Sequence, residues 1–167
     1  MDVAKILKAA AKDRKKLTAF LQKFDEIVPP DLSEIVEEED RKMWAHTDCM
    51  ACANCCKTMT PIFTTEDIAR IAPHLGMTPE AFFEQYLEVE EETGSTINKV
   101  FPCVFLVDNK CSIYEVRPID CAEFPHHDKR PFDDYNETFI QNVFRCPATY
   151  ELVSRLKERI ESEYDFE

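Results

Sequence analysis

The sequence predicts a mainly α-helical protein with a small β-hairpin and irregular loops, folded as a single compact domain. A length of 167 residues suits one domain. Hydrophobic residues make up 44% of the chain and include 12 Phe, which is enough to build a buried core. Apolar residues recur mostly at helical spacing, and only two Gly are present, which argues against a turn-rich β-sandwich.

The first predicted helix runs from Val3 to Val28 and ends before Pro29. Its apolar residues recur at intervals typical of one helix face, with lysines between them. Seven Lys and Arg against two Asp give residues 1–23 a charge of +5, whereas eight acids against two bases give residues 24–46 a charge of −6. These opposite charges predict either a helical hairpin with paired charges or two independent solvated faces.

Two shorter helices are predicted in the middle of the chain. The segment from Thr64 to Asp67 resembles a capping box, and the helix that it opens ends at Gly76. A second helix begins at Thr78, where an N-cap residue is followed by proline at the first helical position. Residues 93–99 are predicted to form a loop.

A β-hairpin is expected between Val100 and Tyr114, where apolar and β-branched residues flank a turn at residues 108–110. The proline-rich stretch 117–131 is predicted to be irregular, and a last helix begins at Pro147. We therefore expect three segments. They are an N-terminal helical hairpin over residues 1–48, a cysteine-rich core over residues 49–128, and a C-terminal helical segment over residues 129–167 that packs on the N-terminal helices.

Charge and hydropathy exclude two classes of partner. The net charge of −13 disfavours nucleic acid, whose binding needs a basic surface. No apolar run is long enough to cross a bilayer, and residues 1–24 lack the pattern of a signal peptide. We therefore expect a cytoplasmic protein whose thiols stay reduced, with metal binding or redox chemistry favoured over disulfides. The basic N-terminal segment could dock an acidic protein, which the sequence does not identify. The sequence predicts no oligomeric state.

Eight cysteines carry the chemical signal. Cys49, Cys52, Cys55 and Cys56 form a C-x-x-C-x-x-C-C run, in which the C-x-x-C spacing lets two thiolates reach one ion. Thiolates select Zn²⁺, Cu⁺ or iron–sulfur clusters. Adjacent cysteines diverge on an extended backbone, so two neighbouring sites or a metal cluster would use both Cys55 and Cys56.

The remaining cysteines lie near the predicted hairpin and before the last helix: Cys103, Cys111, Cys121 and Cys146. Eight thiols permit two four-thiolate sites, or one four-ligand cluster with bystanders. An isolated cysteine such as Cys146 is as often a core residue as a ligand.

The motif resembles a known family. The C-x-x-C-x-x-C-C run is followed by Pro102-Cys103-Val104-Phe105-Leu106, by Cys111-Ser-Ile-Tyr-Glu-Val-Arg-Pro, and by Cys121 and Phe124-Pro125. In this order and spacing, residues 49–125 resemble the YkgJ-type cysteine-cluster family, a zinc- or iron-chelating domain. The resemblance implies that metal is held by seven residues: Cys49, Cys52, Cys55, Cys56, Cys103, Cys111 and Cys121. We add Cys146 as an eighth candidate ligand.

The chain departs from the family pattern at two positions near this site. Ala53 stands where glycine is common in the family, and Ala122 stands where arginine is usual. Arg117 could offset thiolate charge, and we expect it to lie around the site with Tyr114. The histidines near the cysteines are further candidate ligands, namely His46, His126 and His127.

The sequence thus predicts a protein that chelates zinc through a cysteine cluster, with a largely structural metal. The alternatives are iron or a 4Fe–4S cluster with redox or radical chemistry, and a thiol-based redox sensor. No hydrolase triad or H-E-x-x-H motif is present, so the sequence predicts no reaction.

Overall fold

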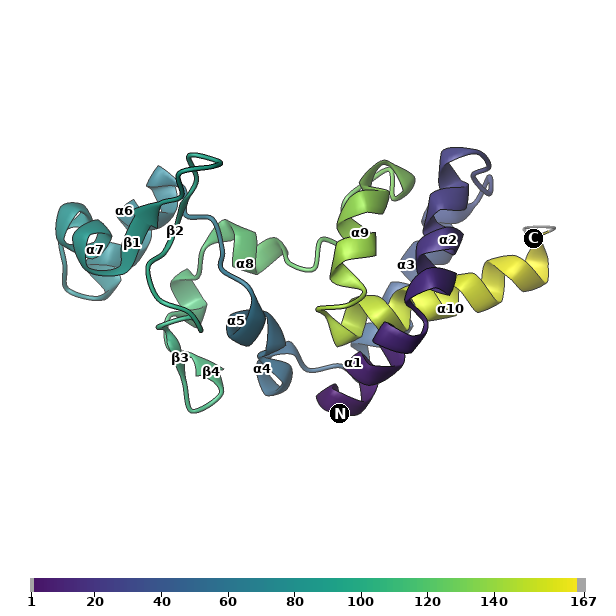
Figure 1. Cartoon of the computed structure of the whole chain (residues 1–167), viewed down its shortest axis with the longest axis horizontal. Helices are drawn as coiled ribbons and strands as arrows, with labels where there is room; N and C mark the ends of the chain where they lie inside the picture. Colours follow the sequence, from purple (N-terminus) through teal and green to yellow (C-terminus); the bar gives the residue numbers. More distant parts are fainter. Residues whose placement is uncertain (1, 165–167) are drawn as a thin grey trace. The chain divides into compact units, whose positions relative to one another are not determined.

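A computed structural model describes residues 2–164 of the chain (Figure 1). Its contacts divide the chain into two compact units. The first, here called the terminal unit, consists of the chain up to Asp48 together with the chain from Pro125 onward. The second, the cysteine unit, is Cys49–Phe124. The mainly α-helical class with small β-hairpins is confirmed. No helix among the described residues is both long and apolar enough to cross a membrane.

The terminal unit is helical throughout. Its elements are α1 (Val3–Lys12), α2 (Arg14–Gln22), η1 (Lys23–Asp25), α3 (Leu32–Trp44), η3 (Asp133–Tyr135), α9 (Asn136–Asn142) and α10 (Pro147–Glu163). The prediction of one uninterrupted helix over residues 3–28 was wrong, because the chain bends at Asp13, where φ is −85° and ψ is 5°. The Asp13 carboxylate accepts a hydrogen bond of 2.9 Å from the Tyr150 hydroxyl of α10, which holds this bend against another helix.

The core of the terminal unit lies where α10 packs against α1, α2, α3 and α9. Buried side chains from both ends of the chain meet there, and Leu152, Val153, Leu156 and Ile160 form the buried face of α10. Phe132 and Phe139 stack in this core with ring centroids 4.1 Å apart. The terminal unit is therefore built by joining segments that lie far apart in the sequence.

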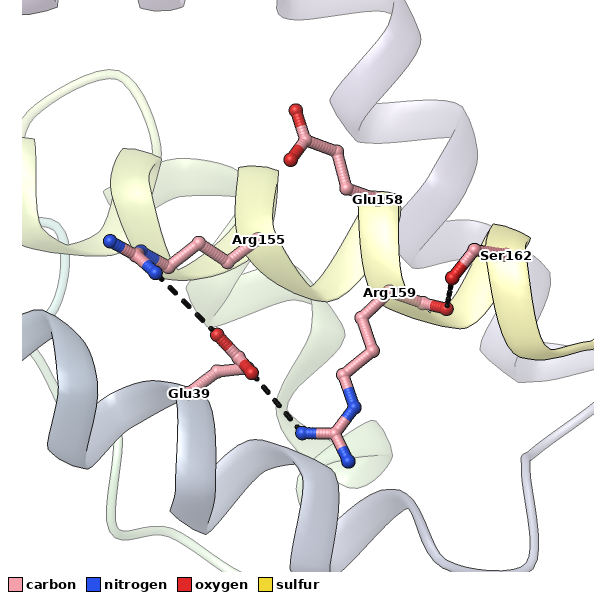
Figure 2. A pocket seen from close by; sticks show the side chains of 5 residues that line it. All are labelled: Glu39, Arg155, Glu158, Arg159 and Ser162. Carbon is pink, nitrogen blue, oxygen red and sulfur yellow. Dashed lines mark hydrogen bonds and ion pairs between the residues drawn. The ribbon is translucent and has the colours of Figure 1, made fainter.

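Charged side chains fasten α3 to α10. Figure 2 shows the Glu39 carboxylate between two guanidinium groups of α10. Its oxygens lie 3.1 Å from the Arg159 nitrogen and 3.7 Å from the Arg155 nitrogen, and Glu39 is only 6% exposed. The acidic helix thus takes its cationic partners from α10 and from its own Lys42. One sequence prediction paired the acidic residues 24–46 with the lysines of α1 and α2. The described ion pairs of α3 instead join Glu38 and Glu39 to Lys42 and Arg159.

The cysteine unit consists of short elements. They are α4 (Cys49–Cys52), α5 (Asn54–Thr58), α6 (Thr65–His74), α7 (Pro79–Tyr86), β1 (Leu87–Val89), β2 (Thr96–Asn98), β3 (Leu106–Val107), β4 (Lys110–Cys111), η2 (Tyr114–Val116) and α8 (Ile119–Glu123). The predicted starts of α6 and α7 are confirmed. Thr64 and Asp67 form a reciprocal capping box, and the Thr78 hydroxyl accepts a hydrogen bond of 3.2 Å from the Ala81 amide.

Two antiparallel hairpins flank the cysteines. The predicted one is confirmed as β3 and β4, with Leu106 opposite Cys111 and a turn in which Asp108 and Asn109 both have positive φ. The second pairs β1 with β2, where the sequence had predicted only a loop over residues 93–99. The prediction of an irregular stretch over residues 117–131 was also wrong, because it contains α8. The strands β1 and β2 and the helix α8 have only three to five residues each, which is too short for the spacing of apolar residues to reveal them in the sequence.

The core of the cysteine unit surrounds Phe82 of α7, which is fully buried. The centroid of its ring lies 6.2 Å from the ring centroid of Phe63, 5.4 Å from that of Tyr86 and 6.0 Å from that of Phe105. Phe105 lies between Cys103 and the β3–β4 hairpin, so this aromatic cluster supports the chain that carries two of the cysteines.

Candidate metal centre

The dense cysteine run lies on two short helices that meet at Ala53. Cys49 and Cys52 belong to α4, and Cys55 and Cys56 belong to α5. Between them Ala53 adopts a left-handed backbone with φ 49° and ψ 19°. A residue with a Cβ atom pays about 1 kcal/mol or more for this conformation, whereas glycine does not. Glycine at this position would adopt the same backbone without that cost.

Backbone and side-chain hydrogen bonds tie the second group of cysteines to the first. The Cys103 amide donates to the Cys56 carbonyl at 3.0 Å. The Asn109 side-chain amide, at the tip of the β3–β4 hairpin, donates to the Ala51 carbonyl at 3.0 Å. These bonds bring the segment that carries Cys103 and Cys111 next to α4 and α5.

The segment that carries Cys121 is held by Asp67. Asp67 is 1% exposed, and one of its oxygens accepts a 3.0 Å hydrogen bond from the Ile119 amide at the start of α8. The Arg70 guanidinium donates to the same carboxylate oxygen at 2.6 Å and to the Arg117 carbonyl at 2.9 Å. The capping residue of α6 thus also anchors α8.

A second carboxylate fastens α8 from its other side. The Asp120 carboxylate accepts a hydrogen bond of 3.0 Å from the Ile62 amide, in the stretch between α5 and α6. Asp120 thereby ties the helix that carries Cys121 to the chain that follows α5.

Electrostatic interactions place most of the thiols in one region of the cysteine unit. Cys55 interacts with thiols from α4, from its own helix, from the hairpin segment and from α8: Cys52, Cys56, Cys103, Cys111 and Cys121. Cys49, the first residue of α4, is exposed. The structure therefore brings together residues separated by up to 69 positions in the sequence, as the candidate ligand set requires.

A hydrogen bond between Cys55 and Cys56 shifts their pKa values in opposite directions. The Cys56 thiol donates to Cys55, and this bond lowers the pKa of Cys55 to about 7. The same bond, together with burial and the neighbouring thiols, raises the pKa of Cys56. Cys55 therefore ionises before Cys52, Cys56, Cys103, Cys111 and Cys121, whose pKa values are all raised.

The other thiols resist ionisation. Burial raises the pKa of Cys52, Cys103, Cys111 and Cys121, and the charge of Cys55 adds to this effect at each of them. Backbone hydrogen bonds at Cys52, Cys103 and Cys111 oppose this rise in pKa. So do the Asn98 amide, which lies 3.7 Å from the Cys103 sulfur, and the positive charges of Lys57 on Cys52 and of Arg117 on Cys111. A thiol cluster of this kind gains from a cation that can replace its protons.

The side chains are not arranged as a complete metal-coordination site within the described residues. Within residues 2–164, no three Cys, His, Asp or Glu side chains are arranged so that they could hold an ion as they stand. The backbone of the cysteine unit thus gathers the candidate ligands, and their side chains are not set around one point.

The remaining candidate ligands belong to the terminal unit. Cys146 is 7% exposed and precedes α10 as its N-cap residue. His46 contacts the Glu151 carboxylate at 2.7 Å. Both ring nitrogens of His127 are bonded, one to Asp40 at 2.7 Å and the other to Thr149 at 2.9 Å, so this histidine links α3 to α10.

Arg117 and Tyr114 lie against each other. The guanidinium carbon is 4.0 Å from the centre of the Tyr114 ring, and Arg117 donates to the Tyr114 carbonyl at 2.8 Å. The positive charge of Arg117 also acts on Cys111, which places the pair near one of the thiols. Their predicted role in supporting a metal stays a prediction.

Sequence reasoning missed the residues that position the cysteines. Asp67 was visible as a helix cap, but its bond to Ile119 spans 52 positions and has no local signal. Asn98 was assigned to a loop, yet its side chain contacts the Cys103 sulfur. Polar residues in short segments of a cysteine-rich sequence are the only hint that could have pointed to them.

We predict that Asp67→Asn destabilises the cysteine unit by about 2 kcal/mol at pH 7, because an amide cannot accept from all the donors around a buried carboxylate. Although burial opposes it, hydrogen bonds from Thr64, Arg70 and Ile119 keep the pKa of Asp67 below its usual 3.8. A lowered pKa adds stability above that value, and this stability is lost as the pH falls through the native-state pKa. Urea unfolding should therefore show wild type and variant converging in acid.

The matched control for this prediction is Glu66→Gln, an exposed residue in the same helical turn. We expect a change below about 0.5 kcal/mol there. Equal effects of the two substitutions would show that Asp67 does not anchor α8.

Comparison with known proteins supports this site. The model of the CxxCxxCC family, described as a "putative zinc- or iron-chelating domain", matches residues 48–143, which is more than half of the chain. The matched range contains seven of the eight cysteines. No curated protein and no solved structure is similar enough to be matched. The chain belongs to the CxxCxxCC family of zinc- or iron-chelating domains.

Proposed function

We propose that this protein binds Zn²⁺ through thiolates of the cysteine unit, and that the metal is structural. One observation carries the proposal. Thiols from α4, α5, the hairpin segment and α8 all interact with Cys55, and burial and mutual repulsion keep most of them protonated. Family membership supports a metal at this place in the chain.

The donor set fits a soft cation. Thiolates are the ligands preferred by zinc, and four of them complete a tetrahedral structural site. Two complete four-thiolate sites would need all eight cysteines, and Cys146 lies in the core of the terminal unit. We therefore propose that the ligands come from the seven cysteines of the cysteine unit. These thiols must also stay reduced, so the proposal suits a protein of the cytoplasm.

Short elements explain why this unit would need a metal. Several have two to five residues, and they are joined by irregular chain. A bound zinc ion would offset thiolate charge and cross-link the segments that a small hydrophobic core and a few hydrogen bonds hold together. Structural zinc contributes about 10–16 kcal/mol in small peptides, which exceeds what such a core supplies alone.

Cobalt substitution tests the proposed coordination. The full chain is freed of metal under anaerobic conditions and titrated with Co²⁺, whose spectrum reports its ligands. We expect sulfur-to-cobalt charge-transfer bands and the strong visible bands of tetrahedral cobalt, both removed by added Zn²⁺. A pale octahedral spectrum without charge-transfer bands would contradict a thiolate site.

One observation favours a second function, that of a thiol-based redox sensor. The hydrogen bond from Cys56 and the pKa of about 7 give Cys55 a larger thiolate fraction at neutral pH than the neighbouring thiols whose pKa is raised. In metal-free protein at pH 7.5, we expect iodoacetamide to label Cys55 first, as read by peptide mass spectrometry. Below pH 6 this preference should fade, because Cys55 is then protonated.

The zinc and redox functions predict different behaviour of the loaded protein. A zinc site slows labelling of Cys55 when metal is bound, and chelation restores it. A sensor without metal gives the same labelling rate before and after chelation. Cys121→Ser separates the two functions, because it removes a proposed ligand and leaves the Cys55–Cys56 bond in place. Zinc should protect Cys55 less in this variant, whereas labelling of the metal-free protein should not change.

A further inference from the structure

The first two helices carry a basic patch on an otherwise acidic chain. The patch consists of Lys5, Lys8, Lys12, Lys15 and Lys16, all of which are exposed. Residues 1–23 have a charge of +5 while the whole chain has −13, so the remainder carries −18. A basic surface in such a setting is not explained by solubility alone.

These lysines are placed at a local energetic cost. Lys5, Lys8 and Lys12 recur at intervals of three and four residues, so they lie on one side of α1 and repel one another. Lys15 and Lys16 lie in the first turn of α2, where the helix dipole disfavours positive charge, and that turn contains no acidic residue. Each such effect is worth a few tenths of a kcal/mol.

No described ion pair compensates for this repulsion. None of the five lysines forms a described ion pair, and the carboxylates of α3 pair instead with Lys42, Arg155 and Arg159. Asp13, the acid between α1 and α2, is bonded to the Tyr150 hydroxyl. Arg14 is also not part of the patch, because its guanidinium packs over the Phe144 ring at 4.8 Å.

We propose that this lysine patch docks an acidic segment of a partner protein. From Lys5 to Lys12 the patch extends over about 11 Å along α1, at 1.5 Å per residue, and Lys15 and Lys16 continue it on α2 beyond the bend at Asp13. A partner segment of at least two helical turns, or of three or more extended residues, is long enough to contact it.

The same observations disfavour the two other anionic partners. A nucleic acid extends beyond the patch and meets a surface with a charge of −18, and the patch offers neither an exposed aromatic ring nor a free arginine fork. A membrane anchor needs apolar side chains that can insert, and residues 3–23 contain no exposed large hydrophobic side chain. The proposal therefore commits to a polypeptide.

Fluorescence anisotropy with a labelled peptide of ten glutamates tests the proposal on the full chain. We expect binding that weakens as salt is raised, because the contacts are exposed ion pairs. Lys12→Glu should weaken binding about fivefold, and Lys8→Glu with Lys12→Glu more than about tenfold. Circular dichroism and melting verify that the variants fold.

Arg41→Glu is the matched control, because Arg41 is an exposed cation of α3 outside the patch and its reversal changes the net charge equally. We expect it to change binding less than about twofold. Absence of peptide binding, or equal losses in Lys12→Glu and Arg41→Glu, would overturn the proposal. Tighter binding to a ten-base-pair DNA duplex or to phosphatidylserine vesicles, with the same dependence on Lys12, would also overturn it and assign the patch to that partner.

Discussion

Replacing Cys103 by serine is expected to remove bound metal and to unfold the cysteine unit. Cys103 lies at the junction of the hairpin segment and α5, where its amide binds the Cys56 carbonyl and its sulfur lies near Asn98. Loss of a ligand forfeits several of the about 10–16 kcal/mol that a structural zinc supplies. Metal analysis should show loss of the ion, and urea unfolding should show an early transition. Cys55→Ser should behave in the same way.

Cys146→Ala is the control for these substitutions. Cys146 is a buried residue of the terminal unit, and its truncation should cost about 1 kcal/mol or less without loss of metal. Full retention of metal and of the unfolding midpoint in Cys103→Ser would contradict the role of Cys103. Loss of metal in Cys146→Ala would return this residue to the ligand set.

Phe82→Ala is expected to have the other large effect. Phe82 is fully buried and its ring contacts those of Phe63, Tyr86 and Phe105. Truncation of a buried phenylalanine costs about 3–5 kcal/mol, because contacts are lost and a cavity remains. We expect the metal-free variant to be unfolded in the cysteine unit, whereas added zinc restores the fold through ligands that the substitution leaves intact.

Val89→Ala serves as the comparison, because Val89 lies on β1 of the same unit and is 54% exposed. Its change in unfolding free energy should stay below about 0.5 kcal/mol. If Phe82→Ala is as mild as Val89→Ala, the aromatic cluster does not support the cysteines. If zinc fails to rescue Phe82→Ala at saturating concentration, the cross-link is not the main stabilising element.

The longer helices of the cysteine unit were predictable from the sequence, whereas its shortest elements were not. The capping box at Thr64 and the Pro79 start gave α6 and α7 correctly, because these signals are local in sequence. The break at Asp13 could not be found, since the apolar spacing continues through it and its partner Tyr150 lies 137 positions away. The strands β1 and β2 and the helix α8 were missed because they span only three to five residues.

The sequence located the cysteines of the candidate site, whereas the contacts that gather them had no local signal, and the ligand set stays a prediction. Thiol spacing identified the C-x-x-C-x-x-C-C run directly, and seven cysteines do lie in one unit. The contacts that gather them were not visible, because Asp67, Asn98 and Asn109 act through distant backbone or sulfur atoms. The helical conformation of Cys55 and Cys56 also differs from the extended backbone that the sequence argument assumed.

Elemental analysis of the full chain, purified once in air and once anaerobically, tests the central claim most directly. Thiol titration before and after chelation accompanies it. The account predicts about one zinc ion per chain in both preparations, a colourless protein, and thiols that become reactive only when the metal is removed. A brown anaerobic preparation that contains iron and sulfide, or a metal-free protein in which all eight thiols react at once, would contradict it.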